Sequence, residues 1–435
     1  MRLTVNDLLK SVPGARIPVG KPDVEFEGAY VDSRAPREGG LFVGVRGEFA
    51  DGGQHAPDAL RDGAAAAVVG ESAWRWIEGD VQGMRRPVVV VKDPVAALQA
   101  VGRLALERSG ARVVGVTGAT GKTTTKDTIV AMLRAAGVAA QGSPGNRNTE
   151  VGVPMSLLDL DEGCEVAVIE MGMRGLGQIA QLAELAPPDV ACITTIGPVH
   201  LELLGTVEAV AQAKAEILAA LRPGGTAVVP DDEPLLDPYV AALDPGVRVI
   251  RFGATPGISL DLSLSKAWEL RNAAAALACC EALGALPPEG ARIEVEISGL
   301  RGQERPIPGG GVLIEDCYNA NPLGMRAALA DLAIRPGRRV AVLADMMELG
   351  PEEERYHREV GEAAAAEGID LVIGVGDRAA AYVSGANGLE AVHIATVEAA
   401  LEEVPALLVD GDVVLLKGSR SMRLERLGAV IAPVS

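Results

Sequence analysis

Aromatic residues, basic charge and paired cysteines are all scarce in this sequence. Aromatic side chains make up 3% of the 435 residues, whereas glycine occurs 52 times, which favours an α/β protein with glycine turns over a β-sandwich. Lys+Arg number 40 and Asp+Glu 59, and the resulting net charge of −19 argues against a broad nucleic-acid-binding surface while leaving room for a local phosphate pocket. The five cysteines include no CxxC pair, so we expect buried, reduced thiols in a cytoplasmic protein rather than a disulfide framework or a zinc site.

Membrane-targeting features are scarce as well. The N-terminal stretch MRLTVNDLLKSVPG lacks the basic residues and the apolar core of a signal peptide. No apolar run approaches the ~20 residues that a membrane-spanning helix needs. The hydrophobic share of 48% predicts large buried cores. At roughly 150 residues per domain, the length indicates about three domains.

Two series of short β-branched segments, each followed by a helical pattern, predict two parallel sheets. The first contains VVGVTG, EVAVIEMG and VACITTIG, and the second contains VLIEDC, RRVAVLAD, IDLVIGVG, LEAVHIA and DVVLLKGS. Such alternation indicates βαβ units. We therefore predict an α/β fold of three domains: a small mixed α/β domain at 1–108, a central parallel sheet of the phosphate-loop ATPase type at 109–308, and a C-terminal Rossmann-like domain at 309–435.

The most specific local motif is TGATGKTTT at 117–125, which follows a predicted strand and opens a predicted helix. In that context backbone N–H groups cradle anionic oxygens, a lysine reaches the β- and γ-phosphates, and a hydroxyl ligates Mg²⁺. Such loops usually have a glycine five residues before the glycine of the Gly-Lys pair. Val116 occupies that position here and the glycine comes at Gly118, so the loop is a variant. The residues predicted to bind ATP and Mg²⁺ are Gly118, Ala119, Thr120, Gly121, Lys122, Thr123 (also a metal ligand) and Thr124.

This variant loop resembles the ATP loop of the Mur ligases, the amide-forming enzymes of peptidoglycan precursor synthesis. Further motifs follow in family order along almost the whole chain: DSRAPREGGLFVGVRGE (32–48), GNRNTEVGVP (145–154), AVIEMGMRGLGQIA (167–180), GPVHLELLG (197–205), AQAKAEIL (211–218), EDCYNANP (315–322), ADMMELG (344–350), YHREVG (356–361) and KGSRSMRLE (417–425). Of these, YNANP, ADMMELG and KGSRSM resemble the branch that joins D-alanyl-D-alanine to UDP-MurNAc-tripeptide. The DNPR and HHPT signatures of other branches are absent.

The resemblance implies a ligase that phosphorylates the tripeptide carboxylate with ATP, so that the amine of D-alanyl-D-alanine attacks an acyl phosphate. Such phosphoryl transfer needs charge neutralisation and in-line positioning more than covalent protein chemistry. Its partners are then two small molecules, UDP-MurNAc-tripeptide and D-alanyl-D-alanine, and we expect a cytoplasmic monomer. The third residue of the tripeptide, meso-diaminopimelate or lysine, stays open.

Three further side chains are predicted to act in catalysis with the loop lysine. Glu170 ends a predicted strand, at the edge where ligands collect in open α/β sheets, so it is a candidate Mg²⁺ ligand. His200 follows the end of another predicted strand, and the resemblance implies that it contacts the metal or the acyl phosphate. The alternatives are a capping or solvated glutamate and a structural histidine. Lys214 matches a lysine that the family carbamylates with CO₂, and such a carbamate would hold a second Mg²⁺. By its position alone, Lys214 is a helix-face lysine that pairs with Glu208 or Glu216 or faces solvent.

The remaining matches are implied by the resemblance as nucleotide and substrate contacts. They are Asn272 for adenine, Arg301 and Asp316 for the nucleotide, Ser33 and Arg34 for the uridine diphosphate, Asn319 and Asn321 for the dipeptide or nucleotide pocket, and Lys417, Ser419 and Arg420 for the carboxylate of D-alanyl-D-alanine. A lysine and an arginine fork suit a carboxylate. A capped helix start is the alternative for the last three.

The central domain departs from the family pattern at one place. Between VRVIRFG (247–253) and a helix starting near Trp268 only a short segment remains, near 254–267. The family has extra strands and a Gly-x-His-Asn element there, whereas this chain has Lys266-Ala-Trp-Glu269. This departure motivates a rival of another class, a non-catalytic module that binds nucleotide or UDP-muramyl-peptide. Within the enzymes, the alternatives are another Mur ligase or a folylpolyglutamate-synthase-like ligase.

Overall fold

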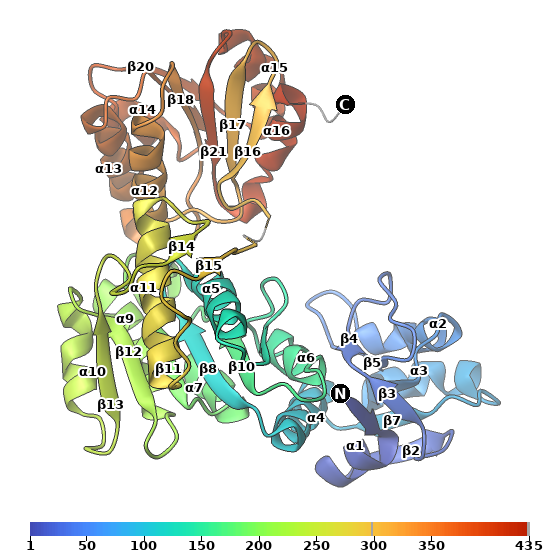
Figure 1. Ribbon diagram of the computed structural model, residues 1–435. Coiled ribbons are helices and arrows are strands. Elements are labelled where there is room, and N and C mark those ends of the chain that lie inside the picture. Colours follow the sequence, from blue (N-terminus) through green and yellow to red (C-terminus); the bar gives the residue numbers. More distant parts are fainter. Residues whose placement is uncertain (297–298, 433–435) are drawn as a thin grey trace.

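The computed structural model describes residues 1–296 and 299–432, and its strands form three larger sheets in chain order (Figure 1). The predicted α/β fold with three sheet-containing units is confirmed. In Figure 1 the N-terminal unit lies to one side of the central unit and the C-terminal unit lies above it. The boundaries at 108/109 and 308/309 stay a prediction.

The first unit is a small mixed sheet. Its five strands have the order β2-β7-β6-β5-β4, with β2 antiparallel to β7 and the others parallel, and β1 pairs separately with β3. Its elements are β1 (Arg2–Thr4), α1 (Val5–Ser11), β2 (Arg16–Val19), β3 (Glu25–Glu27), β4 (Ala29–Tyr30), β5 (Leu41–Val43), α2 (Ala56–Arg61), β6 (Ala66–Gly70), α3 (Glu71–Val81), β7 (Val88–Val91) and α4 (Pro94–Ser109).

The central unit is built on a six-stranded, all-parallel sheet of order β13-β12-β11-β8-β10-β9. Its elements are β8 (Arg112–Thr117), α5 (Lys122–Ala135), β9 (Ala140–Gly142), α6 (Gly152–Leu158), β10 (Val166–Glu170), α7 (Gln178–Leu185), β11 (Val190–Ile193), α8 (Leu201–Leu204), α9 (Val207–Ala219), β12 (Thr226–Pro230), α10 (Asp237–Ala241), β13 (Arg248–Phe252), β14 (Asp261–Leu262), α11 (Ala267–Ala282) and β15 (Arg292–Ile293).

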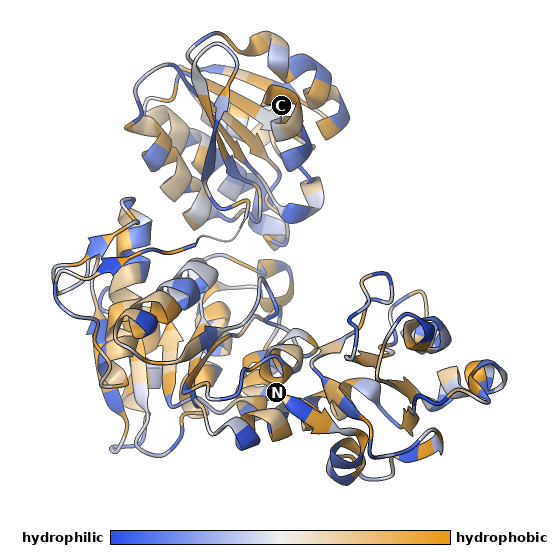
Figure 2. Cartoon of the chain, turned by 45° about the vertical axis from the view of Figure 1, so that its right-hand side comes forward, coloured by the Kyte–Doolittle hydropathy of each residue, from blue (hydrophilic) through white to orange (hydrophobic). Residues whose placement is uncertain are grey.

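Successive residues of the central strands face two different layers of helices. Val113 and Ile169 belong to the core beneath α6, α7 and α9, whereas Val114 and Val168 belong to the core beneath α5 and α11. All of β10 is buried because helices cover both faces of the sheet. For this reason these strands are continuous hydrophobic runs and do not alternate with polar residues. Figure 2 shows hydrophobic strands enclosed by helices that carry many polar residues.

The third unit has a second open sheet, of order β16-β17-β21-β18-β19-β20. All strand pairings in this sheet are parallel except that of β16 with β17. Its first strand, β16, consists of residues that precede the predicted 308/309 boundary. Its elements are β16 (Gln303–Ile307), β17 (Gly311–Asp316), α12 (Pro322–Ala333), β18 (Arg339–Ala344), α13 (Glu353–Ala366), β19 (Leu371–Val375), α14 (Ala380–Gly385), β20 (Glu390–Ile394), α15 (Val397–Leu407), β21 (Val413–Lys417) and α16 (Glu425–Ile431).

The shortened segment of the central unit still closes its core. Residues 261–262 and 292–293 form the small parallel pair β14-β15. Leu264 and Ile293 are buried in the cluster that α11 shares with the central sheet. The shortened segment therefore still contributes side chains to the core beside α11.

Hydrophobic contacts join the central unit to both of its neighbours. Met155 and Leu158 of α6 belong to the same cluster as Leu98 and Val101 of α4, which follows the first sheet. On the other side, one cluster runs from the α7 and α9 layer into the α12 and α13 layer of the third unit. The central unit is thus packed against both.

The contact between α4 and α6 gives a prediction about stability. A Cβ at Gly102 of α4 would lie 2.7 Å from Pro154 Cβ and 2.8 Å from Pro154 Cα. Gly102→Ala should therefore lower the free energy of unfolding by ~1–3 kcal/mol, because the two helices must separate. Gly79→Ala in α3 is the control. Nothing lies within 4 Å of its Cβ position, so alanine should raise stability by ~0.5–1 kcal/mol. Equal effects in urea unfolding would contradict this packing.

Candidate functional site

The loop between β8 and α5 is closely fitted to its surroundings. Gly118 has φ +155°, and a Cβ there would lie 1.9 Å from Thr194 Oγ1. Gly121 has φ +80°, and a Cβ there would lie 2.3 Å from Asn272 Oδ1. The Ala119 N–H donates to the Thr195 carbonyl oxygen (2.9 Å). The strand–loop–helix context predicted for this motif is thus observed, and both glycines are required by the space available.

The first turn of α5 is open to an anion. Its N-cap residue is Gly121, and no side chain caps the helix. Uncapped N–H groups at a helix N-terminus favour a phosphate or another anion. Lys122 begins the helix, and its Nζ donates to the Gly118 carbonyl oxygen (2.9 Å). Burial lowers the pKa of Lys122, while nearby Glu170 raises it and Arg301 lowers it further.

Glu170 is the central carboxylate of the site. It ends β10 and is 2% exposed, so the predicted alternative of a solvated glutamate is not observed. The Thr123 hydroxyl donates to its Oε2 (2.7 Å), and Asn148 Nδ2 donates to its Oε1 (2.7 Å). A carboxylate beside a hydroxyl is a hard oxygen donor set of the kind Mg²⁺ prefers. Among the described residues no three His, Cys, Asp or Glu side chains form a metal cluster.

Lys214 lies in the interior of α9 and is only 2% exposed. No hydrogen bond or ion pair joins its ammonium to another described residue. The predicted alternative of a pair with Glu216 is not observed, because that carboxylate accepts from the Gly177 and Ala180 N–H groups at the start of α7. Burial, and then the charge of Lys122, lowers the pKa of Lys214 well below its usual value. A neutral amine is what carbamylation requires, and the carbamate itself stays a prediction.

Residues at the border of the third unit reach toward the loop lysine. The Arg301 guanidinium stacks over the Tyr318 ring, with 3.8 Å from its Cζ to the ring centroid, and its buried Nε has no hydrogen-bond partner among the described residues. Asp316, at the end of β17, accepts from Lys417 Nζ (2.6 Å), which also donates to the Asn319 carbonyl oxygen (3.1 Å). Lys417 is thus held beside the YNANP loop.

His200 follows β11, as predicted, but its ring faces a neighbour that the sequence did not indicate. Nδ1 contacts a carboxylate oxygen of Glu348, which lies in the loop after β18 of the third unit. Both residues have positive φ, +54° for His200 and +63° for Glu348. The prediction that His200 touches metal or acyl phosphate stays untested.

The other predicted substrate residues have local partners. Asn321 caps α12 by accepting from the Gly324 N–H (2.9 Å). Ser419 Oγ accepts from the Met347 N–H (2.9 Å), and Arg420 pairs with Glu425 (2.9 Å). In the first unit, Ser33 is half-buried, and the exposed Arg34 side chain pairs with its neighbour Asp32 (2.8 Å). Their contacts to substrates stay predictions.

Sequence reasoning missed Asn148, Tyr318 and Glu348, although each lies in a motif that carried the family resemblance. Their roles depend on partners 22, 17 and 148 residues away along the chain. Lys126 was also missed. It is 3% exposed and donates to the Ser143 carbonyl oxygen (2.8 Å). In the sequence it is one more cation in a polar helix start, without a signal of burial.

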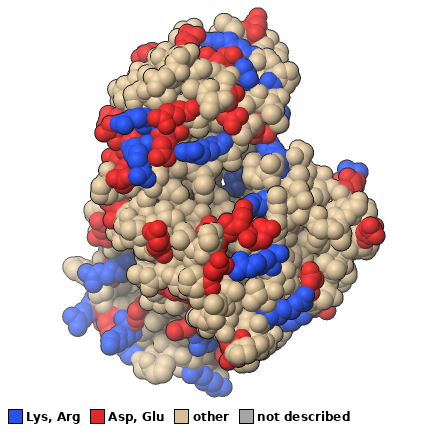
Figure 3. Space-filling view, turned by 90° about the vertical axis from the view of Figure 1, so that its left-hand side faces the viewer, with Lys and Arg blue, Asp and Glu red and all other residues tan. Residues whose placement is uncertain are grey.

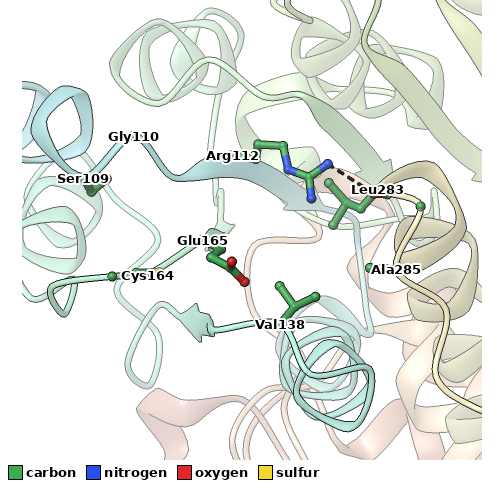
Figure 4. Close-up of a pocket in the computed structure, with 10 residues that line it drawn as sticks. Ser109, Gly110, Arg112, Val138, Cys164, Glu165, Leu283 and Ala285 are labelled. Atoms are coloured by element: carbon green, nitrogen blue, oxygen red, sulfur yellow. Dashed lines mark hydrogen bonds between the residues drawn. The ribbon is translucent and has the colours of Figure 1, made fainter.

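A cavity of about 550 Å³ lies at the opposite edge of the central sheet (Figure 4). It is lined by Ser109, Gly110, Arg112, Val138, Gly163, Cys164, Glu165, Leu283, Gly284 and Ala285. Arg112 begins β8, whereas the phosphate loop follows the last residue of β8, so the cavity and the phosphate loop are separated by the ~20 Å length of the strand.

All five cysteines are buried and free, as predicted. No helix in the described part of the chain has the length and apolar character of a membrane span. Acidic and basic side chains are intermixed on the face in Figure 3, without a continuous basic area.

Comparison with known proteins gives matches along the whole chain. The model of the Mur ligase middle domain matches residues 116–280, and that of the Mur ligase glutamate ligase domain matches residues 301–420. The UDP-N-acetylmuramoyl-tripeptide–D-alanyl-D-alanine ligase of Bacillus subtilis is 32% identical, over 98% of each chain. MurF from Acinetobacter baumannii is structurally similar, with a TM-score of 0.84 at 26% identity over 99% of each chain. MurF from Thermotoga maritima in complex with ADP matches with a TM-score of 0.75 at 28% identity, over 93% of this chain and 97% of the other.

His357 of the YHREVG motif gives a prediction about pH. Its fully buried ring accepts from the Met346 N–H at Nε2 (2.9 Å), so Nδ1 donates to the Glu353 carbonyl oxygen (2.7 Å). Burial lowers the pKa of His357 below 6.5. The unfolded chain takes up a proton near pH 6.5 that the native state refuses. The contribution of neutral His357 to the free energy of unfolding is therefore fully present above pH 6.5. It falls by up to ~1.4 kcal/mol per pH unit as the pH drops from 6.5 toward the lower pKa of the native state. His357→Gln should lack this component in urea unfolding between pH 5 and 7.5, and equal slopes would contradict a neutral ring.

Proposed function

We propose that this chain, which belongs to the Mur ligase family, uses ATP to join D-alanyl-D-alanine to UDP-N-acetylmuramoyl-tripeptide in peptidoglycan precursor synthesis. The observation that carries the proposal is the uncapped start of α5 with the Thr123 hydroxyl 2.7 Å from the buried Glu170 carboxylate. This is the equipment of a phosphoryl-transfer site. The relative of the same named activity spans 98% of this chain, so the likeness includes the first unit as well as the two matched domains.

The phosphate loop is the proposed site for the triphosphate of ATP. N–H groups of residues 121–124 would donate to phosphate oxygens, and Lys122 would turn from the Gly118 carbonyl to the transferred γ-phosphoryl group. Asn272, packed against Gly121, stands where an adenine contact is proposed. Arg301 and Asp316 are proposed to meet the nucleotide from the border of the third unit. The unpaired Nε of Arg301 supports this, since a phosphate oxygen would satisfy it.

Thr123, Glu170 and His200 are proposed to hold Mg²⁺, and Lys214 as a carbamate to hold a second ion. When bound, Mg²⁺ neutralises charge on the phosphates and on the group being transferred. Asn148 keeps the Glu170 carboxylate fixed at Oε1 while Oε2 faces Thr123. A carbamate would exchange the positive charge of Lys214 for a negative one, which removes the repulsion that its ammonium has with Lys122.

UDP-MurNAc-tripeptide and D-alanyl-D-alanine are proposed to bind on opposite sides of the phosphate loop and its proposed Mg²⁺ ligands. Ser33 and Arg34 of the first unit would contact the uridine diphosphate. Lys417, Ser419 and Arg420 would receive the carboxylate of D-alanyl-D-alanine, with Asn319 and Asn321 shaping the pocket. Lys417 is already held at the carboxyl edge of the third sheet by Asp316, and this edge also carries the loop that contacts His200.

The assay that tests the proposed function measures phosphate release with ATP, UDP-MurNAc-tripeptide and D-alanyl-D-alanine, each omitted in turn. We expect full turnover only when all three are present, together with a new amide product. Binding of ATP or UDP-MurNAc-tripeptide without turnover would instead support the non-catalytic alternative. Turnover with glutamate in place of the dipeptide would support a folylpolyglutamate-type ligase.

Lys122→Ala is the matched loss-of-function variant for that assay. We expect kcat to fall by roughly 10³-fold or more, because a cation aimed at the transferred phosphate is lost, with an unchanged circular dichroism spectrum. Lys92→Ala, an exposed lysine of the first unit, should behave as the wild type. Near-normal turnover of Lys122→Ala would overturn the assignment of the phosphate loop.

Lys214 gives a separate prediction, because a carbamate and an ammonium respond differently to substitution. Lys214→Ala should lose at least roughly 100-fold in kcat, the upper end of the range for groups that orient a metal. Acetate or formate should partly restore it by placing a carboxylate in the vacated space. Lys214→Arg should stay inactive, since a permanent cation cannot ligate a metal. Wild-type activity of Lys214→Arg would contradict the carbamate.

A further inference from the structure

Two motifs of the third unit, ADMMELG (344–350) and YHREVG (356–361), have no part in the proposed chemistry. The loop that carries the first leaves the carboxyl end of β18 and crosses to the central unit. There Glu348 contacts His200 Nδ1 through Oε2, while Arg174 Nε lies 3.6 Å from Oε1. The Glu202 N–H donates to the Glu348 carbonyl oxygen (3.2 Å). One residue of the third unit is thus joined to two segments of the central unit, 174 and 200–202.

Backbone strain marks both sides of this contact. Among the described residues only four non-glycine residues have positive φ, and two of them are His200 and Glu348. A non-glycine residue in this region is strained and persists only where the surroundings hold it. The other two, Leu300 and Arg423, do not contact each other or this loop in any recorded hydrogen bond or ion pair of the described chain. Strain is therefore concentrated where the two units meet.

The loop is anchored from its own unit before it reaches the central one. The buried His357 ring accepts from the Met346 N–H (2.9 Å), and Ser419 Oγ accepts from the Met347 N–H (2.9 Å). The Ser419 N–H in turn donates to the Asp345 carbonyl oxygen (3.2 Å). The backbone of residues 345–347 is thus held by His357 of α13 and by Ser419 in the loop that follows β21. The direction in which Glu348 leaves the third unit is thus set by the fold.

We propose that Glu348 is a positioning residue that fixes the ring of His200. A carboxylate at Nδ1 requires Nδ1 to carry the proton, which leaves Nε2 as the only acceptor of the ring, the form in which histidine ligates a metal or accepts a proton. The inference rests on the proposed function only in that it takes His200 to act in the ligase reaction. It adds that His200 is correctly oriented only while the third unit is docked on the central unit.

A double-mutant cycle tests this. Glu348→Ala should lower kcat roughly 10–100-fold, the range for residues that orient a metal-binding histidine, and should raise the Mg²⁺ concentration at half-maximal rate. The KM for UDP-MurNAc-tripeptide should change little. His200→Ala should have an effect at least as large, and the double variant should be no slower than His200→Ala alone, because Glu348 acts through that ring. If the kcat of the double variant falls by the product of the two single-variant losses, the proposal is overturned.

Two further variants separate positioning from folding. Glu352→Ala, which removes an exposed carboxylate paired with Arg355 three residues further on, should keep wild-type kcat and Mg²⁺ dependence. Glu348→Gln keeps an acceptor oxygen for the Nδ1 proton and should retain more activity than Glu348→Ala. If Glu348→Ala does not fold, the cycle is run with Glu348→Gln and has the same two outcomes. If the wild type does not require all three substrates, the proposed function is overturned. If the wild type is an active ligase but the kcat losses of the two single variants multiply in the double variant, only the role of Glu348 is overturned.

Discussion

The site depends on the parallel register of three neighbouring strands. Glu170 at the end of β10 lies opposite Val116 of β8, and Ile193 at the end of β11 lies opposite Thr117. All three strands therefore end at one edge, and the loops that leave them start side by side. One is the phosphate loop, one begins beside the carboxylate of Glu170, and one holds Thr194 against Gly118 before it reaches His200. Segments about 80 residues apart in the chain meet here because the sheet is parallel, a geometry that helices on both faces make possible.

Charge in this edge region is unbalanced in a direction that suits an anionic ligand. Lys214 is buried and Lys122 is partly buried, and the charge of Lys122 lowers the pKa of Lys214 while Arg301 lowers the pKa of Lys122. The carboxylate of Glu170 raises the pKa of Lys122 in opposition to burial and Arg301, and it already accepts two hydrogen bonds. An unpaired buried ammonium opposes folding unless it loses its proton or gains a partner. The phosphate groups of a bound ligand supply such a partner. A protein of net charge −19 can thus bind a highly anionic nucleotide at a local positive site.

The sequence predicts the inner strands of the two larger sheets well, because strands such as β10, β19 and β21 are uninterrupted runs of buried residues. The phosphate loop could be predicted for a related reason, since its chemistry depends on contiguous residues. Glu348 could not be assigned a role from the sequence, because its partner His200 lies 148 residues away and in another sheet unit. The same holds for Asn148, whose amide is indistinguishable in the sequence from that of Asn146. Lys214 was recognised by resemblance alone, since burial inside α9 follows from packing against β8 and β11 and not from its neighbours AQA and AEI.

The border between the central and third units combines a continuous hydrophobic cluster with polar contacts. Arg301 stacks on Tyr318, His200 meets Glu348, and Lys266 Nζ lies 3.4 Å from Asp331. The last pair comes from the shortened segment, where a lysine stands in place of the family's His-Asn element, and both of its side chains are about one-tenth exposed. Buried ion pairs contribute little net stability but penalise arrangements that separate them. The Lys266–Asp331 pair therefore selects one docked orientation of the third unit more than it strengthens the interface. In that orientation Arg301, stacked on Tyr318 of the third unit, lies close enough to Lys122 for its charge to lower the pKa of that lysine.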